Sequence, residues 1–361
     1  MNKFKKGAII LGLIIIVMIF FVFFYNNEYS GFQYIKPGIK EDTKYSYGFQ
    51  STKLIKAVDG SNIEAWYYTP KLRSDSVIIM TGGMAATKED GLEKYALYFM
   101  ESGYSVLLFD YRTFGGSEGM PRHWLDMGRQ LDDFTSVVTF AKEILKFDSI
   151  ALWGSSYSGG IALTTAANNI ADIDCVISQV SFIRNPEEFE TNPGLMLRFL
   201  PWLLIDSARL KINNTFSLNL EPIYVPAFGK PGENAFLVSS ESPSIDYFEN
   251  NKANPESVYW DNLPKEYRGG WENKILIRGL IGFEDQYLPV NNMEKIMCPV
   301  FLLTAENDMT VPAKYIREAY ERIPHNNKRI STFDCGHFDI YIEDNYTRAV
   351  KEQIEFLNEY L

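Results

Sequence analysis

Strand-like and helix-like segments alternate along most of the chain after residue 76. Strand candidates lie at residues 77–80, 150–153, 299–304 and 329–333. One segment between two strand candidates carries an apolar stripe at three- and four-residue spacing, formed by Met127, Leu131, Phe134, Val138 and Ala141. Because strands that alternate with helices favour a mostly parallel, doubly wound sheet, we predict an α/β fold.

The alternation stops between about residues 182 and 291. This stretch is rich in proline and aromatic residues, and more than a hundred residues of this composition need a surface to pack on. The alternative is that this stretch is a plain insertion on the surface, with no further role. At 361 residues the chain could hold two domains, but α/β folds with insertions often form one.

The amino-terminal segment predicts a membrane anchor. Lys3, Lys5 and Lys6 precede an uncharged run at residues 7–25, and its 19 residues are enough to cross a bilayer core. A cleaved signal peptide is the alternative, but no A-x-A-like site follows the run. We expect an uncleaved single span in the lipid bilayer, with a cytoplasmic amino terminus and the folded part of the chain outside.

Charge and cysteine usage exclude several classes of protein. The formal net charge is −11, and no basic patch suggests nucleic acid. The cysteines Cys175, Cys298 and Cys335 have no C-x-x-C spacing, which argues against a metal site or redox pair. Cys175 and Cys298 fall near the starts of neighbouring predicted strands, so a bridge is permitted. With no P-loop lysine and no dinucleotide motif, we expect no cofactor.

A serine on a glycine-lined turn is the first candidate for chemistry. Ser156 follows the strand at residues 150–153, and Gly154, Gly159 and Gly160 flank it. This is the pattern of a nucleophile elbow, a sharp strand-to-helix turn that exposes a strained serine. Ser158 stands where such turns usually have glycine, and it adds a Cβ atom there.

An acid and a histidine follow two later strands. Asp308 comes after the strand at residues 299–304, and His337 comes after the strand at residues 329–333. Glu306 competes with Asp308 for the acid role. His325 lies in a polar surface turn, and His123 is left open between packing and the site.

These residue types suit acyl transfer. Neutral histidine can take the serine proton, and a buried carboxylate fixes the imidazole tautomer. The developing oxyanion needs two backbone N–H donors, one from the residue after the serine and one from an early loop. We expect the donors at Tyr157 and Gly83, with Met84 close behind.

The order Ser156, Asp308, His337 resembles the α/β-hydrolase superfamily, and more narrowly its bacterial esterase, dienelactone-hydrolase-like and Xaa-Pro-peptidase-like branch. Residues 109–119 look like the D-x-R-x-x-G-x-S loop of that group, and residues 129–134 and 336–341 are also similar. The resemblance implies an α/β-hydrolase fold with a cap inserted between the sixth and seventh strands. Asp110 and Arg112 are then either a binding pair or a pair that holds the loop.

We therefore predict four regions: an anchor at residues 1–30, core parts at 31–181 and 292–361, and a cap at 182–291. Trp202 and Trp260 of the cap are candidates to contact an acyl chain. The predicted activity is cleavage of a small-molecule carboxylic ester by a serine hydrolase. The alternatives are a peptidase acting on small peptides and a membrane-anchored binding protein without turnover.

Overall fold

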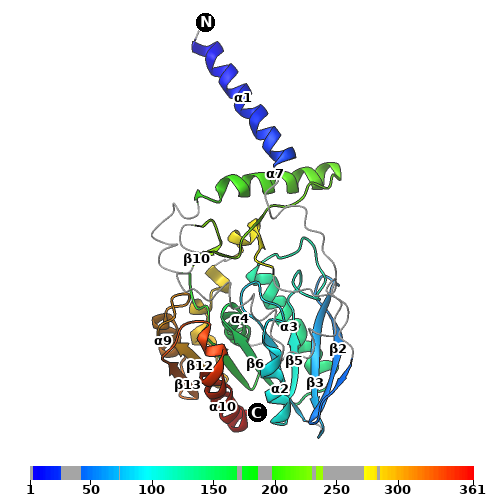
Figure 1. The fold of residues 1–361 in the computed structure, drawn as a ribbon, viewed down its shortest axis with the longest axis vertical. Coiled ribbons are helices and arrows are strands. Elements are labelled where there is room, and N and C mark those ends of the chain that lie inside the picture. Colours follow the sequence, from blue (N-terminus) through cyan, green and yellow to red (C-terminus); the bar gives the residue numbers. More distant parts are fainter. Residues whose placement is uncertain are drawn as a thin grey trace.

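The computed structural model describes residues 3–25, 42–72, 74–168, 173–185, 197–229, 233–238, 272–282 and 285–361. Within them, nine strands form one sheet in the order β1-β2-β3-β5-β4-β6-β7-β12-β13 (Figure 1). The strands are β1 Thr43–Lys44, β2 Gly48–Lys56, β3 Asn62–Pro70, β4 Ser76–Thr81, β5 Ser105–Phe109, β6 Ser149–Ser155, β7 Cys175–Gln179, β12 Val300–Ala305 and β13 Lys328–Phe333. The six strands from β5 to β13 pair in parallel, whereas β1, β2 and β3 pair antiparallel. The predicted α/β fold with a mostly parallel sheet is confirmed.

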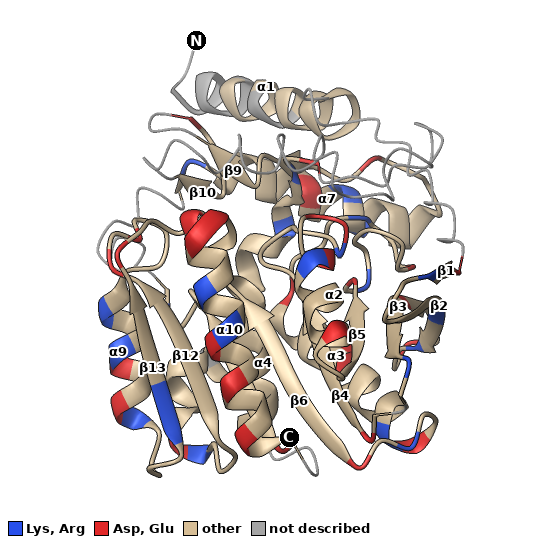
Figure 2. Ribbon diagram, turned by 60° about the horizontal axis from the view of Figure 1, so that its bottom comes forward, with Lys and Arg blue, Asp and Glu red and all other residues tan. Residues whose placement is uncertain are grey.

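Helices cover both faces of the sheet. They are α2 Glu93–Glu101, α3 Met127–Glu143, α4 Tyr157–Ala167, α9 Ala313–Arg322 and α10 Glu343–Tyr360. Ile79 and Leu152 pack with α3, α4 and α9, while Ile78 and Trp153 pack with α2 and α10. Neighbouring residues of one strand thus serve opposite faces, which explains the continuous apolar runs. Figure 2 shows that charged residues, coloured blue and red, recur along the ribbons of α9 and α10.

The predicted strands and helix fall where the structure has them. The four strand candidates overlap β4, β6, β12 and β13, and the apolar stripe lies on α3. All five stripe residues are buried, and the Asp126 side chain caps α3 by accepting the Arg129 N–H at 3.0 Å. Cys175, Cys298 and Cys335 are free thiols, so the permitted bridge is not formed.

The segment between β7 and β12 departs from the βα alternation. Its described helix is α7 Leu200–Phe216, and its described strands are β8 Tyr224–Val225, β9 Phe228–Gly229, β10 Leu237–Val238 and β11 Ile275–Leu276. Its described 3₁₀ helices are η2 Ile277–Ile281, η3 Asp285–Tyr287, η4 Pro289–Asn291 and η5 Met293–Lys295. Outside this segment, the 3₁₀ helix η6 Asp339–Tyr341 precedes α10. Figure 1 shows α7 far from the C-terminus, between α1 and the rest of the molecule. Trp202 of α7 packs on Phe199, with ring centroids 5.9 Å apart, whereas Trp260 lies outside the described residues.

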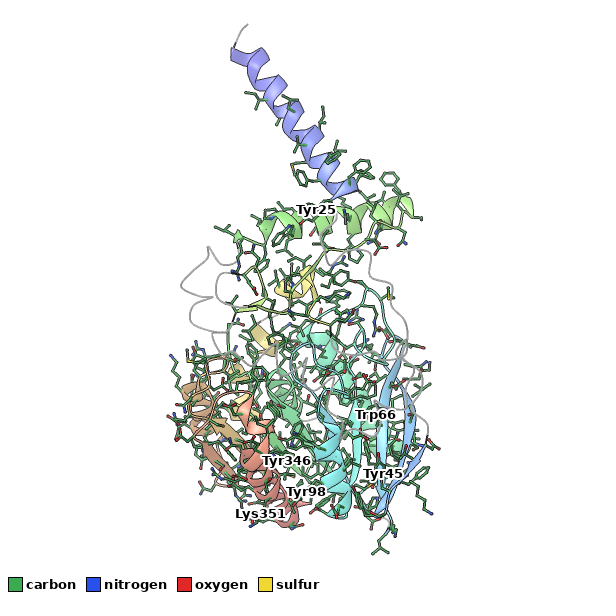
Figure 3. The ribbon with its side chains drawn as sticks, viewed as in Figure 1. Tyr25, Tyr45, Trp66, Tyr98, Tyr346 and Lys351 are labelled. Carbon is green, nitrogen blue, oxygen red and sulfur yellow. The ribbon has the colours of Figure 1, made fainter. Side chains whose placement is uncertain are left out.

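A long helix, α1 Lys3–Phe24, meets α7 at its carboxyl end. The Arg209 guanidinium of α7 donates to the carbonyls of Val22, at 2.7 Å, and Tyr25, which Figure 3 labels at this junction. In the part of the chain that the structure describes, no helix combines the length and apolar character that crossing a membrane requires. The predicted membrane span at residues 7–25 is therefore not supported.

Candidate active site

Ser156 occupies a strained backbone conformation between β6 and α4, with φ 51° and ψ −121°. The turn is tight because the chain must reverse from a central strand into a helix that packs back on the sheet. A Cβ atom on Gly154, Gly159 or Gly160 would overlap atoms of neighbouring residues. The three glycines therefore supply the gaps that the elbow pattern predicts.

Ser158, the departure from the glycine pattern, holds this turn to a neighbouring loop. Its side chain is fully buried, and its hydroxyl donates to the Gly82 carbonyl. A glycine could not make this hydrogen bond. No sequence pattern indicates this role, because the acceptor lies 76 residues away along the chain.

The structure brings Ser156, His337 and Asp308 together from three separate strand ends. His337 Nε2 lies 3.0 Å from Ser156 Oγ, and its Nδ1 lies 2.7 Å from Asp308 Oδ2. The imidazole and the Asp308 side chain are both buried. The Nδ1–H group can donate to Asp308 while Nε2 accepts from the serine hydroxyl, which is the arrangement that a general base needs.

Backbone groups fix the Asp308 carboxylate. Its Oδ1 accepts the N–H groups of Thr310 at 2.8 Å and Val311 at 2.6 Å, which leaves Oδ2 facing His337. Glu306, the competing acid, is half-exposed and pairs with Arg317 on the surface. Of the two acids, only Asp308 contacts the imidazole within the described residues.

The other two histidines serve other contacts. His325 lies in the turn before β13, at the end of that strand opposite His337. His123 is buried, and its Nε2 lies 3.0 Å from Glu272 of the segment between β7 and β12. Burial lowers the pKa of His123, and the Glu272 carboxylate opposes that shift. His123, whose role the sequence analysis left open, therefore contacts the segment between β7 and β12.

Other nucleophiles close to Ser156 are engaged or protonated. The Ser155 hydroxyl is buried and hydrogen-bonded to the Tyr341 hydroxyl. Burial raises the pKa of the Cys335 thiol to about 11, and the nearby Asp339 and Asp308 carboxylates act in the same direction. Cys335 therefore keeps its proton at neutral pH, and Ser156 is the hydroxyl that His337 can activate.

The two expected oxyanion donors flank Ser156. A Cβ atom on Gly83 would lie 3.1 Å from Ser156 Cβ and 3.7 Å from Ser156 Oγ, so the Gly83 backbone lies beside the serine side chain. Tyr157 is the first residue of α4, where helix N–H groups point out of the helix end. Its hydroxyl donates to Gln130 Oε1 at 2.5 Å, which fixes this first turn against α3. The Met84 side chain packs in the core.

Asp110 and Arg112 do not pair with each other. Asp110 accepts the Gly116 N–H at 2.8 Å, whereas Arg112 pairs with Asp133 of α3. Burial raises the pKa of Asp133 to about 6, and the Arg112 guanidinium opposes the shift. Asp110 and Arg112 therefore each hold the loop that follows β5 in place. The sequence missed Lys88, a fully buried residue that also contacts Asp110.

Comparisons with known proteins bear on the family of the chain. The model of the α/β hydrolase fold family matches residues 77–344. Quorum-quenching protein AidA of Acinetobacter baumannii is 30% identical over 297 residues, which cover 81% of this chain and 90% of that protein. A thiohydrolase of Eupenicillium brefeldianum is 23% identical over 310 residues, 84% of this chain and 92% of that protein.

A solved structure gives the same fold. The α/β hydrolase GrgF from a Penicillium species superposes with a TM-score of 0.68 at 23% identity, over 86% of this chain and 98% of that one. The family and its hydrolase-named relatives support a hydrolase, while the narrower branch inferred from the sequence stays a prediction. On this evidence, the chain belongs to the α/β-hydrolase fold family.

Proposed function

We propose that the chain is a serine hydrolase that cleaves a carboxylic ester through an acyl-enzyme intermediate. One observation carries the proposal: His337 bridges Ser156 Oγ, at 3.0 Å, and Asp308 Oδ2, at 2.7 Å, within hydrogen-bond distance of both. In this proposal Ser156 is the nucleophile, His337 the general base and Asp308 the carboxylate that orients the imidazole.

The reaction then runs in two halves. Ser156 Oγ bonds to the substrate carbonyl carbon as its proton passes to His337 Nε2, and the carbonyl oxygen becomes an oxyanion. When the tetrahedral intermediate collapses, His337 gives that proton to the departing alcohol oxygen. Water repeats the sequence on the acyl-enzyme, and the acid leaves with Ser156 restored.

The oxyanion is assigned to the backbone N–H groups of Gly83 and Tyr157. Two features support this assignment: the Gly83 backbone lies beside Ser156, and Tyr157 begins a helix, whose positive end stabilises nearby negative charge. Such donors act on the transition state more strongly than on the bound substrate, so they raise kcat.

We further propose that the segment between β7 and β12 forms a cap that meets the acyl part of the substrate. Phe182, at its start, donates its N–H to the Ser156 carbonyl at 2.9 Å, and its ring lies 6.2 Å from that of Tyr157. The start of the segment is therefore bound to the turn that carries the nucleophile, with the Phe182 ring beside Tyr157. A cap of this kind favours acyl chains longer than acetyl, by up to about 0.8 kcal/mol for each buried methylene.

Ester cleavage leads the substrate classes, and a small-peptide amide is the alternative. The relative named a thiohydrolase adds thioesters to the classes worth testing. A protein that binds without turnover is the third reading, and the hydrogen-bonded Ser156, His337 and Asp308 argue against it.

The test combines labelling with turnover. A fluorophosphonate probe should label the wild-type protein and the Ser155→Ala control, but not Ser156→Ala. Purified protein should then be assayed on p-nitrophenyl esters of graded chain length, on matched thioesters and on aminoacyl nitroanilides. Labelling of Ser156→Ala, or the absence of turnover on every substrate class, would refute the proposal.

A further inference from the structure

Lys88 is a fully buried lysine in the loop of residues 82–92, which joins β4 to α2. Its ammonium forms an ion pair with Asp110 and lies 2.9 Å from Glu64 Oε1 and 3.6 Å from Glu89 Oε1. It also lies 5.0 Å from the ring centroid of Trp66, which Figure 3 labels. Burying a charged group costs several kcal/mol before its partners offset the loss, so stability alone is a weak reason for such a cluster.

The main chain of Lys88 is held by the same carboxylate as its side chain. The Lys88 N–H donates to Asp110 Oδ1 at 2.6 Å, while the ammonium binds Oδ2. Asp110 directly follows β5, and Glu64 belongs to β3. Lys88 therefore ties the 82–92 loop to two strands inside the sheet.

The neighbouring loop is shaped around these carboxylates. A Cβ atom on Gly115 would overlap the Asp110 carboxylate, and one on Gly116 would overlap that of Glu64. The Gly116 N–H also donates to Asp110 Oδ2 at 2.8 Å. The loop of residues 111–119 therefore packs closely on the carboxylates that bind the Lys88 ammonium.

The other end of the 82–92 loop lies at the nucleophile. Gly83 lies beside Ser156, and the Ser158 hydroxyl donates to the Gly82 carbonyl. A tight turn follows, in which the Ala86 N–H donates to the Gly83 carbonyl at 3.2 Å. Only four residues separate Gly83 from Lys88. A displacement of Lys88 should therefore be passed on to Gly83 through this short connection.

We propose that Lys88 is a positioning residue, which fixes the 82–92 loop so that the Gly83 N–H stays where the oxyanion forms beside Ser156. It acts through Gly83 and does not touch the reacting atoms. This inference rests on the proposed serine-hydrolase function. It assigns a catalytic consequence to a charge cluster that lies outside the Ser156, His337 and Asp308 group.

The experiment compares Lys88→Met with Arg112→Met. Both residues are buried cations paired with a buried carboxylate, but Arg112 binds Asp133 of α3 and does not hold the 82–92 loop. For each variant we would measure thermal unfolding, kcat and KM on a p-nitrophenyl ester, and the Kd of phenylboronic acid. The boronic acid forms a tetrahedral adduct with serine and places an oxygen at the oxyanion position.

Lys88→Met should lower kcat by about 10- to 100-fold and raise the Kd of the boronic acid by a similar factor, because catalysis and boronic acid binding both depend on the oxyanion donors. KM should stay within about threefold. Arg112→Met should also unfold at a lower temperature than wild type. Measured where the variant is fully folded, its kcat and its boronic acid Kd should stay within about threefold of the wild-type values. Lys88→Arg, which keeps the charge, should recover part of kcat.

If Lys88→Met does not fold, Asp110→Asn provides the second variant, because an amide oxygen can still accept the Lys88 N–H. It should lower kcat by about three- to tenfold with the same unchanged KM. A folded Lys88→Met protein with wild-type kcat, or equal losses in Lys88→Met and Arg112→Met, would overturn the inference alone. A wild-type protein that neither turns over esters nor reacts with fluorophosphonate would instead refute the proposed function.

Discussion

The backbone of Gly83 lies so near Ser156 that a Cβ atom at residue 83 would stand 3.1 Å from Ser156 Cβ. This spacing is tighter than ordinary van der Waals contact, so an added methyl group would push the two segments apart by a few tenths of an ångström. The proposed oxyanion donor and the nucleophile would then separate, although the fold could adapt.

Gly83→Ala should therefore lower kcat by about 10- to 100-fold with a small change in KM, since the lost contact acts mainly on the transition state. Steady-state kinetics on a p-nitrophenyl ester measure both constants. Gly128→Ala is the matched control, because its Cβ would also lie 3.1 Å from a neighbour, the Tyr287 ring, away from Ser156. Equal kinetics in the two variants would contradict the assignment of Gly83.

Asp308→Asn should lower kcat by about 10³- to 10⁴-fold. The Thr310 and Val311 N–H groups require an oxygen at the Oδ1 position, so the new NH₂ group would face His337. It would donate to Nδ1 and shift the imidazole proton to Nε2, where the lone pair is needed. Turnover of a p-nitrophenyl ester measures the loss.

Glu306→Gln is the control for this change, because Glu306 pairs with Arg317 at the surface. Its kcat should stay within about twofold of wild type. A normal rate in Asp308→Asn beside an inactive Glu306→Gln would reverse the assignment of the acid.

Glu89 should make stability depend on pH. Burial raises the pKa of Glu89 to about 8; the carboxylates of Asp110, Glu64 and Asp90 add to the shift, and the Lys88 ammonium opposes it. The ordinary value is 4.5, so between about pH 4.5 and pH 8 the folded protein holds a proton that the unfolded chain releases. The stability contributed by this proton is full below about pH 4.5 and falls as pH rises towards 8.

Urea unfolding from pH 5 to pH 8.5 tests this slope. The free energy of unfolding of wild type should fall relative to that of Glu89→Gln as pH rises, because the amide cannot release a proton. Glu143→Gln, on the exposed part of α3, should keep the wild-type profile. Parallel profiles for wild type and Glu89→Gln would show that Glu89 does not titrate in this range.

Asp206 should contribute strongly to stability through the inserted segment. It forms a two-point ion pair with Arg278, at 2.8 and 3.2 Å, and accepts the Ile223 N–H at 2.9 Å while almost fully buried. Asp206→Ala leaves a largely buried guanidinium without this partner, so the free energy of unfolding should fall by about 3 kcal/mol. Chemical denaturation measures the loss.

The exposed pair Arg329 and Glu359 supplies the comparison. Glu359→Ala should cost less than about 1 kcal/mol, because water screens the half-exposed charges. Similar losses in Asp206→Ala and Glu359→Ala would mean that Asp206 is not part of a cooperative folding unit with the core.

The sequence predicted those features that depend on local pattern. The strands that became β4, β6, β12 and β13 are apolar or β-prone runs with turn residues at their ends, and the stripe of α3 follows helical spacing. Because parallel strands end at the same edge of the sheet, the residues after β6, β12 and β13 could be expected to meet. The structure brings Ser156, Asp308 and His337 within hydrogen-bond distance there.

Features that depend on distant partners were missed or left open. Lys88 is in a loop, where lysine is usually exposed, and its burial depends on carboxylates of β3 and of the residue after β5, which are distant in the sequence. For the acid, the resemblance favours Asp308 over Glu306, and the structure adds that the Thr310 and Val311 N–H groups hold the Asp308 carboxylate. The region boundaries and the location of the catalytic part stay predictions, while the membrane span is not supported.

The sheet order has a consequence for how activity is lost on heating. His337 follows β13, which pairs with β12 on one side and forms the edge of the nine-stranded sheet, whereas β6, which carries Ser156, has β4 and β7 on its two sides. Edge strands open more readily than central ones. Warming should therefore detach the base from an intact nucleophile strand, so that the protein becomes inactive, reversibly, at a temperature below the one at which it unfolds.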